Sequence, residues 1–165
     1  EVSQRVVGLT SAGNIDFVKR LNCCDDVVLY GEEETNIDAS LPAAYVDMSG
    51  DGRLTKALHH HLGENLVESC MVGATHWENM AQAEALPGAT PQFFFAPAQI
   101  TKRDAEWGAG VVMGKAMMAS AELAQAIKGD MSIHWTRGPE DLAVLWNKML
   151  DNQVPPSEAQ MVSLL

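Results

Sequence analysis

The sequence predicts an α/β fold built around a parallel β-sheet. Three features indicate it: short β-branched apolar runs, helical apolar spacing between them, and Gly-, Ser- or Asn-containing turns where one pattern gives way to the other. Strands that alternate with helices pair in parallel, with helices packed on both faces of the sheet. Ligands of such sheets bind at the carboxyl ends of the strands, so these ends are the first place to look for a site.

The first half of the chain contains four predicted strands, at residues 6–10, 27–30, 44–48 and 67–73. A helix with Ile15, Val18 and Leu21 at helical spacing follows the first strand, and Ser11 or Asn14 is expected to cap it. The acidic stretch at residues 31–38 is predicted to be a loop, and a second helix occupies residues 54–62, before Gly63.

The second half is predicted to contain an apolar strand at residues 93–100 that Pro97 stops, helices at residues 105–128 and 139–150, and a final strand at residues 161–165. The strand begins with three consecutive phenylalanines. Their rings occupy both faces of a strand, which is more than one core face buries. We therefore expect residues 93–96 to form an edge strand or a subunit contact.

Composition limits the function classes. The 165 residues are 47% hydrophobic and carry a formal net charge of -11, which fits a domain with a sizeable core but opposes nucleic-acid binding. No apolar run approaches the roughly 18 residues that span a membrane. Cys23, Cys24 and Cys70 are an odd set rather than a disulfide framework, which suits a reducing, cytoplasmic compartment. We interpret the adjacent pair Cys23 and Cys24 as structural.

Two phosphate-binding patterns are excluded at the first strand–helix turn. Gly8 and Gly13 have the spacing of an NTPase phosphate loop, but Asn14 and Ile15 replace the Lys and Ser/Thr that such a loop needs. The dinucleotide pattern G-x-G-x-x-G fails because Thr10 occupies its second glycine position.

Two metal patterns are excluded as well. The segment DMSGDG at residues 47–52 imitates a calcium loop, but Leu58 stands where the bidentate Glu is required. Residues 59–61 are three consecutive histidines, whose side chains fan out by about 100° each on a helix and cannot converge on one ion. We predict a polar helix flank there and no metal site. His76, at a strand end beside Trp77, is the one weak candidate for a catalytic residue, with a structural role as the equal alternative.

Several segments together carry a family resemblance. VVGLTSAGNIDFVKRLNCCDDVVLYGE, YVDMSG and CMVGATHW resemble strand ends in the cofactor domain of the medium-chain dehydrogenase/reductase superfamily, near its quinone-oxidoreductase branch. The chain is more similar still to an uncharacterised bacterial and fungal family within that group, whose members share VGLTSARN, YVDMAG, VGATHWE and FFAPDQIxKR.

The resemblance implies that residues 1–100 form part of a Rossmann-like dinucleotide-binding domain. Residues 101–165 would then be a helical extension whose terminal strand packs on the same domain. It also implies that the first strand and a substrate domain precede Glu1, together with the superfamily's zinc ligands. The chain alone is then expected to be inactive, and its homodimer contact is expected at the strand of residues 93–96.

The expected cofactor is NADPH, with NADH second. The resemblance places the adenosine end at Thr10, Ser11, Asn14 and Tyr30, and the path to the nicotinamide at Met48, Ser49, Gly50, Val72 and Gly73. No Asp or Glu ends the first strand to bind a free ribose 2′-hydroxyl, whereas Ser11 and Asn14 are neutral donors that suit a 2′-phosphate.

The expected function is that of the C-terminal part of an oxidoreductase that transfers hydride to a small carbonyl, enone or quinone. The alternative is a non-catalytic α/β module for nucleotide binding or assembly. A methyltransferase is a weaker third reading, because its glycine-rich first loop is also absent from the sequence.

Overall fold

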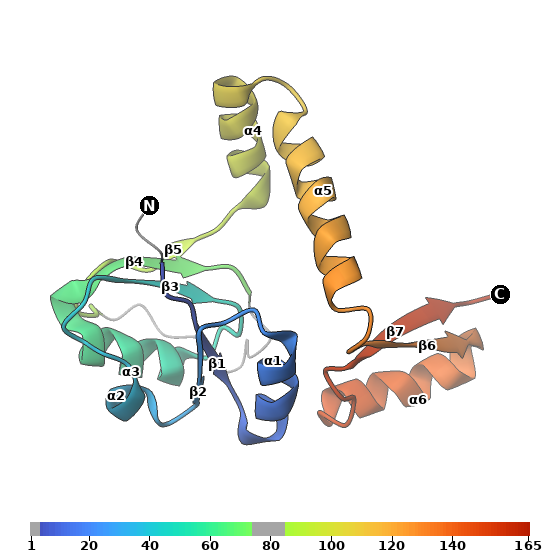
Figure 1. Ribbon diagram of the computed structural model, residues 1–165. Helices are drawn as coiled ribbons and strands as arrows, with labels where there is room; N and C mark the ends of the chain where they lie inside the picture. Colours follow the sequence, from blue (N-terminus) through green and yellow to red (C-terminus); the bar gives the residue numbers. More distant parts are fainter. Residues whose placement is uncertain (1–3, 74–84) are drawn as a thin grey trace. The chain divides into compact units, whose positions relative to one another are not determined.

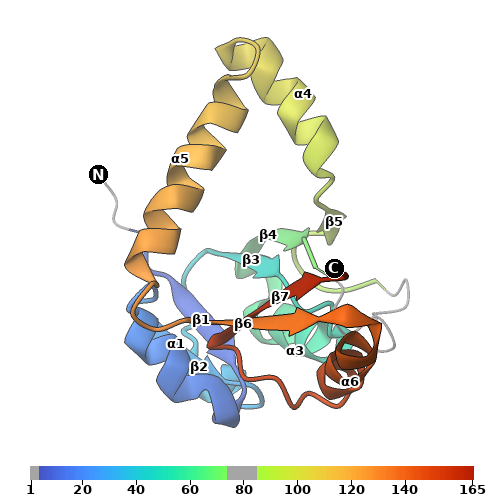
Figure 2. The same ribbon diagram turned by 90° about the vertical axis from the view of Figure 1, so that its right-hand side faces the viewer.

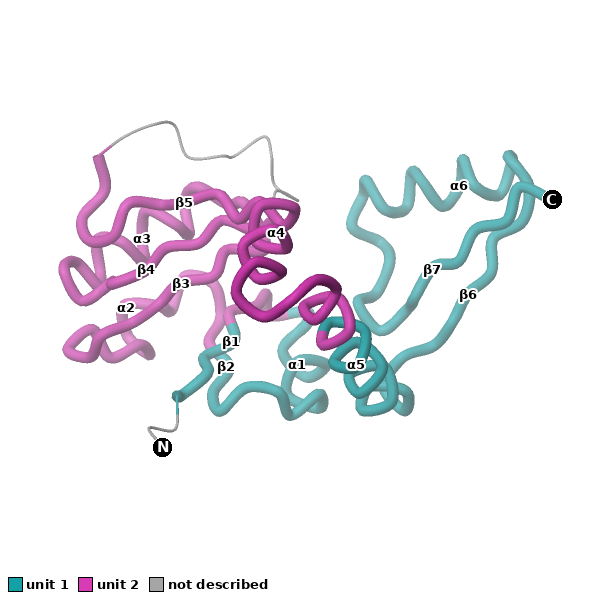
Figure 3. Tube along the Cα trace, turned by 90° about the horizontal axis from the view of Figure 1, so that it is seen from above, with its two compact units in different colours: residues 1–8, 13–27, 116–165 teal, residues 9–12, 28–115 magenta. Residues whose placement is uncertain are grey.

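The computed structural model describes residues 4–73 and 85–165, which fall into two compact units (Figures 1 and 3). Unit 1 comprises Glu1–Gly8, Gly13–Val27 and Ala116–Leu165, and unit 2 comprises Leu9–Ala12 and Val28–Lys115. Each unit is described by itself below. Helices and short parallel sheets make up both, so the predicted α/β class is confirmed.

Unit 2 contains a three-stranded parallel sheet with the order β3–β4–β5. Its strands are β3 (Ala43–Asp47), β4 (Leu66–Met71) and β5 (Gln92–Phe93). β3 and β4 lie within three residues of the predicted strands, because alternating or continuous apolar runs identify strands well. β5 is the edge strand that the phenylalanines predicted, but it is far shorter than residues 93–100.

The long apolar strand predicted at residues 93–100 is wrong, because helix α4 (Ala96–Trp107) begins in its middle. Pro97 occupies the first turn of this helix, where its fixed φ and missing N–H are favourable. Pro97 therefore starts a helix instead of stopping a strand. The helix predicted at residues 105–128 begins later, as α5 (Val111–Ala126), after Gly108 and Gly110 with φ of 103° and 78°.

Helix α3 (Gly52–Leu62) covers one face of the β3–β4–β5 sheet (Figure 1). It supplies Leu58 and Leu62 to a core cluster with Tyr45 and Leu66. The helix ends before a 3-10 turn, η2 (Gly63–Asn65), in agreement with the predicted stop at Gly63. Burial of these side chains anchors α3, and with it the turn that precedes the helix.

A short helix, α2 (Glu33–Asn36), lies in the segment predicted to be a loop. Apolar periodicity could not predict this helix, because it is a single turn and its sequence is acidic and polar. Ile37, just beyond its end, packs against the core cluster beside α3.

The first two strands are β1 (Val7–Thr10) and β2 (Asp26–Leu29), which form a separate two-stranded sheet. The 3-10 turn η1 (Ala12–Asn14) and helix α1 (Ile15–Leu21) connect them. Asn14 is at the predicted N-cap position of α1, but its side chain makes no capping hydrogen bond. The strands thus exist as predicted, but in separate short sheets.

Unit 1 ends in a β–α–β motif with parallel strands (Figure 2). Its elements are β6 (Ser132–Arg137), α6 (Gly138–Leu150) and β7 (Glu158–Ser163). Helix α6 agrees with prediction, and Leu145 is its buried residue. Strand β6 was not predicted, and β7 begins three residues before the predicted final strand. None of the helices in the described part of the chain is long and apolar enough to cross a membrane.

Candidate functional site

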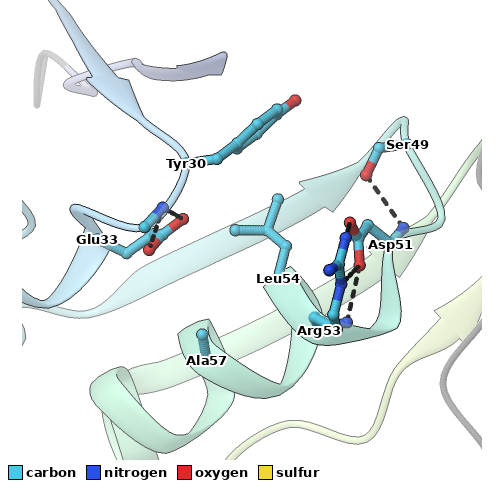
Figure 4. A pocket seen from close by; sticks show the side chains of 8 residues that line it. Tyr30, Glu33, Ser49, Asp51, Arg53, Leu54 and Ala57 are labelled. Carbon is cyan, nitrogen blue, oxygen red and sulfur yellow. Dashed lines mark hydrogen bonds and ion pairs between the residues drawn. The ribbon is translucent and has the colours of Figure 1, made fainter. Parts of the chain in front are cut away.

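A pocket in unit 2 lies where β2 and β3 end. It encloses about 390 Å³, which is within the size range of small-molecule sites. Figure 4 shows the side chains around it: Tyr30 follows β2, and Leu54 points up from the first turn of α3. The full lining is Tyr30, Gly31, Glu33, Ser49, Asp51, Arg53, Leu54 and Ala57.

The β2 side of the pocket is fixed by backbone contacts. The Tyr30 amide donates to the carbonyl of Thr10 at 2.9 Å, which ties the end of β2 to the end of β1. Both carboxylate oxygens of Glu33 accept from the Gly31 amide, at 2.9 and 3.0 Å. Glu33 is only 4% exposed, so its carboxylate stabilises the turn at Gly31 and is not available to solvent.

The β3 side is organised by Asp47, the last residue of the strand, which is 3% exposed. Its Oδ1 accepts from the amides of Ser49 and Gly50 at 2.9 and 2.8 Å and from the Ser49 hydroxyl at 3.0 Å. The Thr55 hydroxyl lies 3.3 Å from Oδ2. Asp47 therefore shapes the turn into α3 from beneath, and Ser49 forms part of the pocket wall.

Asp51 is the N-cap residue of α3, and its Oδ1 accepts from the Arg53 amide at 2.9 Å. The Arg53 guanidinium also pairs with the Asp51 carboxylate at 3.1 Å, although its side chain is 81% exposed. The hydrogen bond from the Arg53 side chain holds the pKa of Asp51 below its ordinary value. Among the described residues that line the pocket, Arg53 is the single cation.

Two tyrosines stand near this turn. Burial raises the pKa of Tyr30, and the carboxylates of Asp47, Asp51 and Glu33 raise it further, so its phenol is neutral at physiological pH. Burial and Asp47 also raise the pKa of Tyr45. The Tyr45 hydroxyl is buried without a geometrically satisfactory hydrogen bond in the described part of the chain. Tyr45 belongs to the core cluster, whereas the uncharged Tyr30 ring lines the pocket and gives it apolar surface beside its polar rim.

The structure brings some of the expected site residues together. Tyr30 and Ser49 line the same pocket, and Gly50 belongs to the Asp47-bound turn beside it. The amides of Val72 and Gly73 donate to the Asp47 carbonyl at 2.8 and 3.0 Å, so the end of β4 adjoins the end of β3.

The contact between Gly73 and Met48 is close. A Cβ atom added to Gly73 would lie 1.9 Å from the Met48 carbonyl oxygen, so only glycine fits there. Met48 itself is 64% exposed. Backbone approach, rather than a ligand, is enough to account for glycine at this position.

The remaining expected residues are not part of the pocket lining. Thr10, the last residue of β1, is 7% exposed, whereas Ser11, directly after it, is exposed. Asn14 belongs to unit 1, where it ends η1 and occupies the N-cap position of α1. His76, the weak catalytic candidate, lies outside the described residues.

Tyr30 and Ser49 apart, sequence reasoning did not select the residues that line the pocket, which are Gly31, Glu33, Asp51, Arg53, Leu54 and Ala57. Asp51 carried a detectable signal, because an Asp three residues before the first apolar residue of the helical pattern is a candidate N-cap. Glu33 carried none, since its role depends on a single turn of helix and on one backbone amide.

The predicted polar flank at residues 59–61 is wrong for His59, which is fully buried. His60 is exposed, and Nε2 of His61 lies 2.8 Å from the Ile37 carbonyl oxygen. The three rings point to different surroundings, as the helical geometry requires. Within residues 4–73 and 85–165, no group of three or more His, Cys, Asp or Glu side chains is placed to hold a metal ion.

Comparison with protein families gives a match over residues 1–155, to the family described as "Protein of unknown function (DUF2855)". The chain belongs to this family. A comparison of this DUF2855 member with curated proteins found no match, and a comparison with solved structures found none either.

Proposed function

We propose that this DUF2855 chain contributes the adenosine-binding part of an NADPH-dependent oxidoreductase. The observation that carries the proposal is the pocket at the carboxyl ends of β2 and β3, with Tyr30 and Ser49 in its wall. Ligands of open parallel sheets bind at this end of the strands. The pocket's mixture of apolar surface and a few polar groups is typical of small-molecule sites.

The order of the strands supports a dinucleotide-binding fold. In the doubly wound fold the order is 3-2-1-4-5-6. Within each sheet, the neighbours β2–β1 and β3–β4–β5 follow the same order as strands 3-2 and 4-5-6 of that arrangement.

The pocket has groups suited to an adenosine moiety. The neutral Tyr30 ring and the Leu54 side chain offer flat and aliphatic surface to a purine. The Ser49 hydroxyl and the Asp51 carboxylate can bind its amine or a ribose hydroxyl. Arg53 is mostly exposed at the rim, where it can pair with a 2′-phosphate. The sequence analysis did not select Arg53, and its positive charge is a further reason to expect NADPH as the cofactor.

A bound nicotinamide would supply the hydride, and the protein would position it. Met48, Gly50, Val72 and Gly73 adjoin one another at the ends of β3 and β4, on the expected path from the adenosine to the nicotinamide. The substrate class remains that of a small carbonyl, enone or quinone. The reduced cysteines suit a cytoplasmic location for such an enzyme.

The alternative is a nucleotide-binding or assembly module without catalysis. The pocket fits this role equally, because nothing in its lining must act on a substrate. The two proposals differ in one observable property: only the oxidoreductase, in its complete form, oxidises NADPH when a quinone or enone is added.

The binding proposal is tested by calorimetric titration of NADPH and NADH into the chain. Tyr30→Ala and Arg53→Gln are expected to weaken NADPH binding at least tenfold, with Arg53→Gln affecting NADH less. Arg103→Gln is the matched control, because Arg103 lies on α4 and pairs with Glu106. Affinity that Tyr30→Ala and Arg53→Gln leave unchanged would exclude this pocket as the adenosine site.

A further inference from the structure

The turn between α1 and β2 brings two adjacent cysteines together. The Sγ atoms of Cys23 and Cys24 are 3.8 Å apart, and both thiols are free. Side chains of neighbouring residues in extended backbone point to opposite sides, so this proximity depends on the turn. The turn follows Asn22, which closes α1 in the left-handed conformation with φ of 49°.

Contacts on both sides hold the pair in place. A Cβ atom on Gly8 would lie 2.7 Å from the Cys24 sulfur, so the missing side chain of Gly8 leaves room for this thiol against β1. The Val6 amide donates to Asp25 Oδ2 at 2.7 Å, and this bond fixes the backbone just after the cysteines. Cys23 is exposed and Cys24 is partly exposed, so the pair lies at the surface.

A direct disulfide fits this pair poorly. The Cα atoms of consecutive residues are about 3.8 Å apart across a trans peptide, below the roughly 4.4–6.8 Å that disulfides span. The sulfurs would also have to close from 3.8 Å to about 2.05 Å. A ligand atom placed between the sulfurs avoids both changes, because it bonds to each while keeping them apart.

The number of protein side chains available as ligands limits which kind of atom can bind between the two sulfurs. No third His, Cys, Asp or Glu completes a metal-binding group in the described part of the chain. The Asp25 carboxylate binds the Val6 amide, and the Asp26 carboxylate pairs with Arg5. Ions that require four protein ligands therefore lack half of their coordination shell, whereas trivalent organic arsenic is satisfied by two thiolates.

We propose that Cys23 and Cys24 form a dithiol site for trivalent organoarsenicals, independent of the nucleotide pocket. An arsenical R–As=O reacts with the two thiols to give R–As(S–Cys)₂ and water. Two As–S bonds form, the As=O bond breaks, and the two thiol protons leave with the oxygen. Nothing is oxidised or reduced. The neutral reagent is not repelled by the neighbouring carboxylates of Asp25 and Asp26.

The test uses the reduced chain and one equivalent of phenylarsine oxide, with intact-mass spectrometry as the readout. We expect one adduct per chain that survives an excess of a monothiol and is removed by a 1,2-dithiol. Cys23→Ser and Cys24→Ser should each reduce its occupancy under monothiol competition at least tenfold. The matched control Cys70→Ser should leave it unchanged.

Peptide mapping of the unsubstituted adduct makes the result independent of how the variants fold. Arsenic on a single peptide that contains both Cys23 and Cys24 supports the proposal. Arsenic that bridges to Cys70, or an adduct as easily removed by monothiol as by dithiol, overturns it. So does ready conversion of the pair to an internal disulfide by glutathione disulfide without any stable arsenical adduct.

Discussion

The imidazole of His59 accepts a hydrogen bond from the hydroxyl of Ser69, with 2.9 Å between Nε2 and Oγ. Its Nδ1 lies 2.8 Å from the carbonyl oxygen of Pro87. Because a carbonyl only accepts, Nδ1 carries a proton, and in the neutral ring Nε2 is the acceptor. Serine and histidine can act as nucleophile and base, but His59 and Ser69 are 0% and 2% exposed and cannot meet a substrate. The role of the pair is therefore structural: it links α3 to β4 and to Pro87.

This arrangement predicts a stability loss for His59→Phe. The substitution leaves the Pro87 carbonyl and the Ser69 hydroxyl without their partner in the interior. We expect the free energy of unfolding to fall by about 2–4 kcal/mol, measured by urea denaturation. His60→Phe is the matched control, because His60 is the exposed neighbour on the same helix. Equal losses in the two variants would contradict the structural role of His59.

The Asp51–Arg53 pair predicts a pH dependence of stability. Since Arg53 lowers the pKa of Asp51 in the folded chain, the ionised carboxylate stabilises the fold at pH values above its unfolded-state pKa of about 3.9. This contribution is lost as pH falls through the lower folded-state pKa. Asp51→Asn keeps a good N-cap without the charge. We therefore expect wild type to exceed this variant in stability at pH 6, with the difference shrinking in high salt and vanishing near pH 2.

The cofactor preference is testable at Ser11, the exposed residue after β1. Ser11 is not part of the pocket lining, but the family resemblance places the 2′-phosphate at this turn. Ser11→Asp puts a carboxylate at the turn, which would repel a 2′-phosphate and offer an acceptor to a free 2′-hydroxyl. We expect the ratio of NADPH to NADH affinity to fall by about tenfold or more. Ser120→Asp on α5 adds the same charge elsewhere and serves as the control. An unchanged ratio in Ser11→Asp would show that this turn does not read the phosphate.

The outer edge of β3 predicts a pattern of amide exchange. The Asp47 carbonyl faces β4, so the backbone groups of Ala44 and Val46 face the opposite edge, where β3 has no neighbour among the described residues. We expect the Ala44 and Val46 amides to exchange rapidly in hydrogen-exchange measurements. Tyr45, whose amide faces β4, is the internal control and should exchange more slowly. Exchange of all three amides at the same rate would contradict this edge.

A homodimer through β5 remains a proposal with a clear test. Phe93 and Phe95 are 66% and 57% exposed next to this edge strand. If a second copy covers them, Phe93→Ser should raise the dimer dissociation constant at least tenfold in sedimentation velocity. Trp135→Ser, at a similarly exposed aromatic on β6, should leave it unchanged. A wild-type chain that sediments as a monomer at micromolar concentration counts against the interface.

Local patterns in the sequence determined most of the elements. Apolar runs predicted β1 to β4 within three residues, and the Leu58–Leu62 stripe with Gly63 predicted the body and end of α3. These patterns succeed because a strand or helix must bury its apolar side chains at its own period. They failed at Pro97, where the same residue that breaks a strand also begins a helix.

Only the tertiary structure decided which polar groups work together. It joined Tyr30 and Ser49 in one pocket with Glu33 and Arg53, and it buried His59 between Ser69 and Pro87. Each of these contacts links residues from different elements, and its existence depends on how those elements pack. The period of a sequence shows which face of an element is buried. The period does not show which donor or acceptor from a distant part of the chain lies against that buried face, because a hydrogen bond depends on atomic positions to within a few tenths of an ångström.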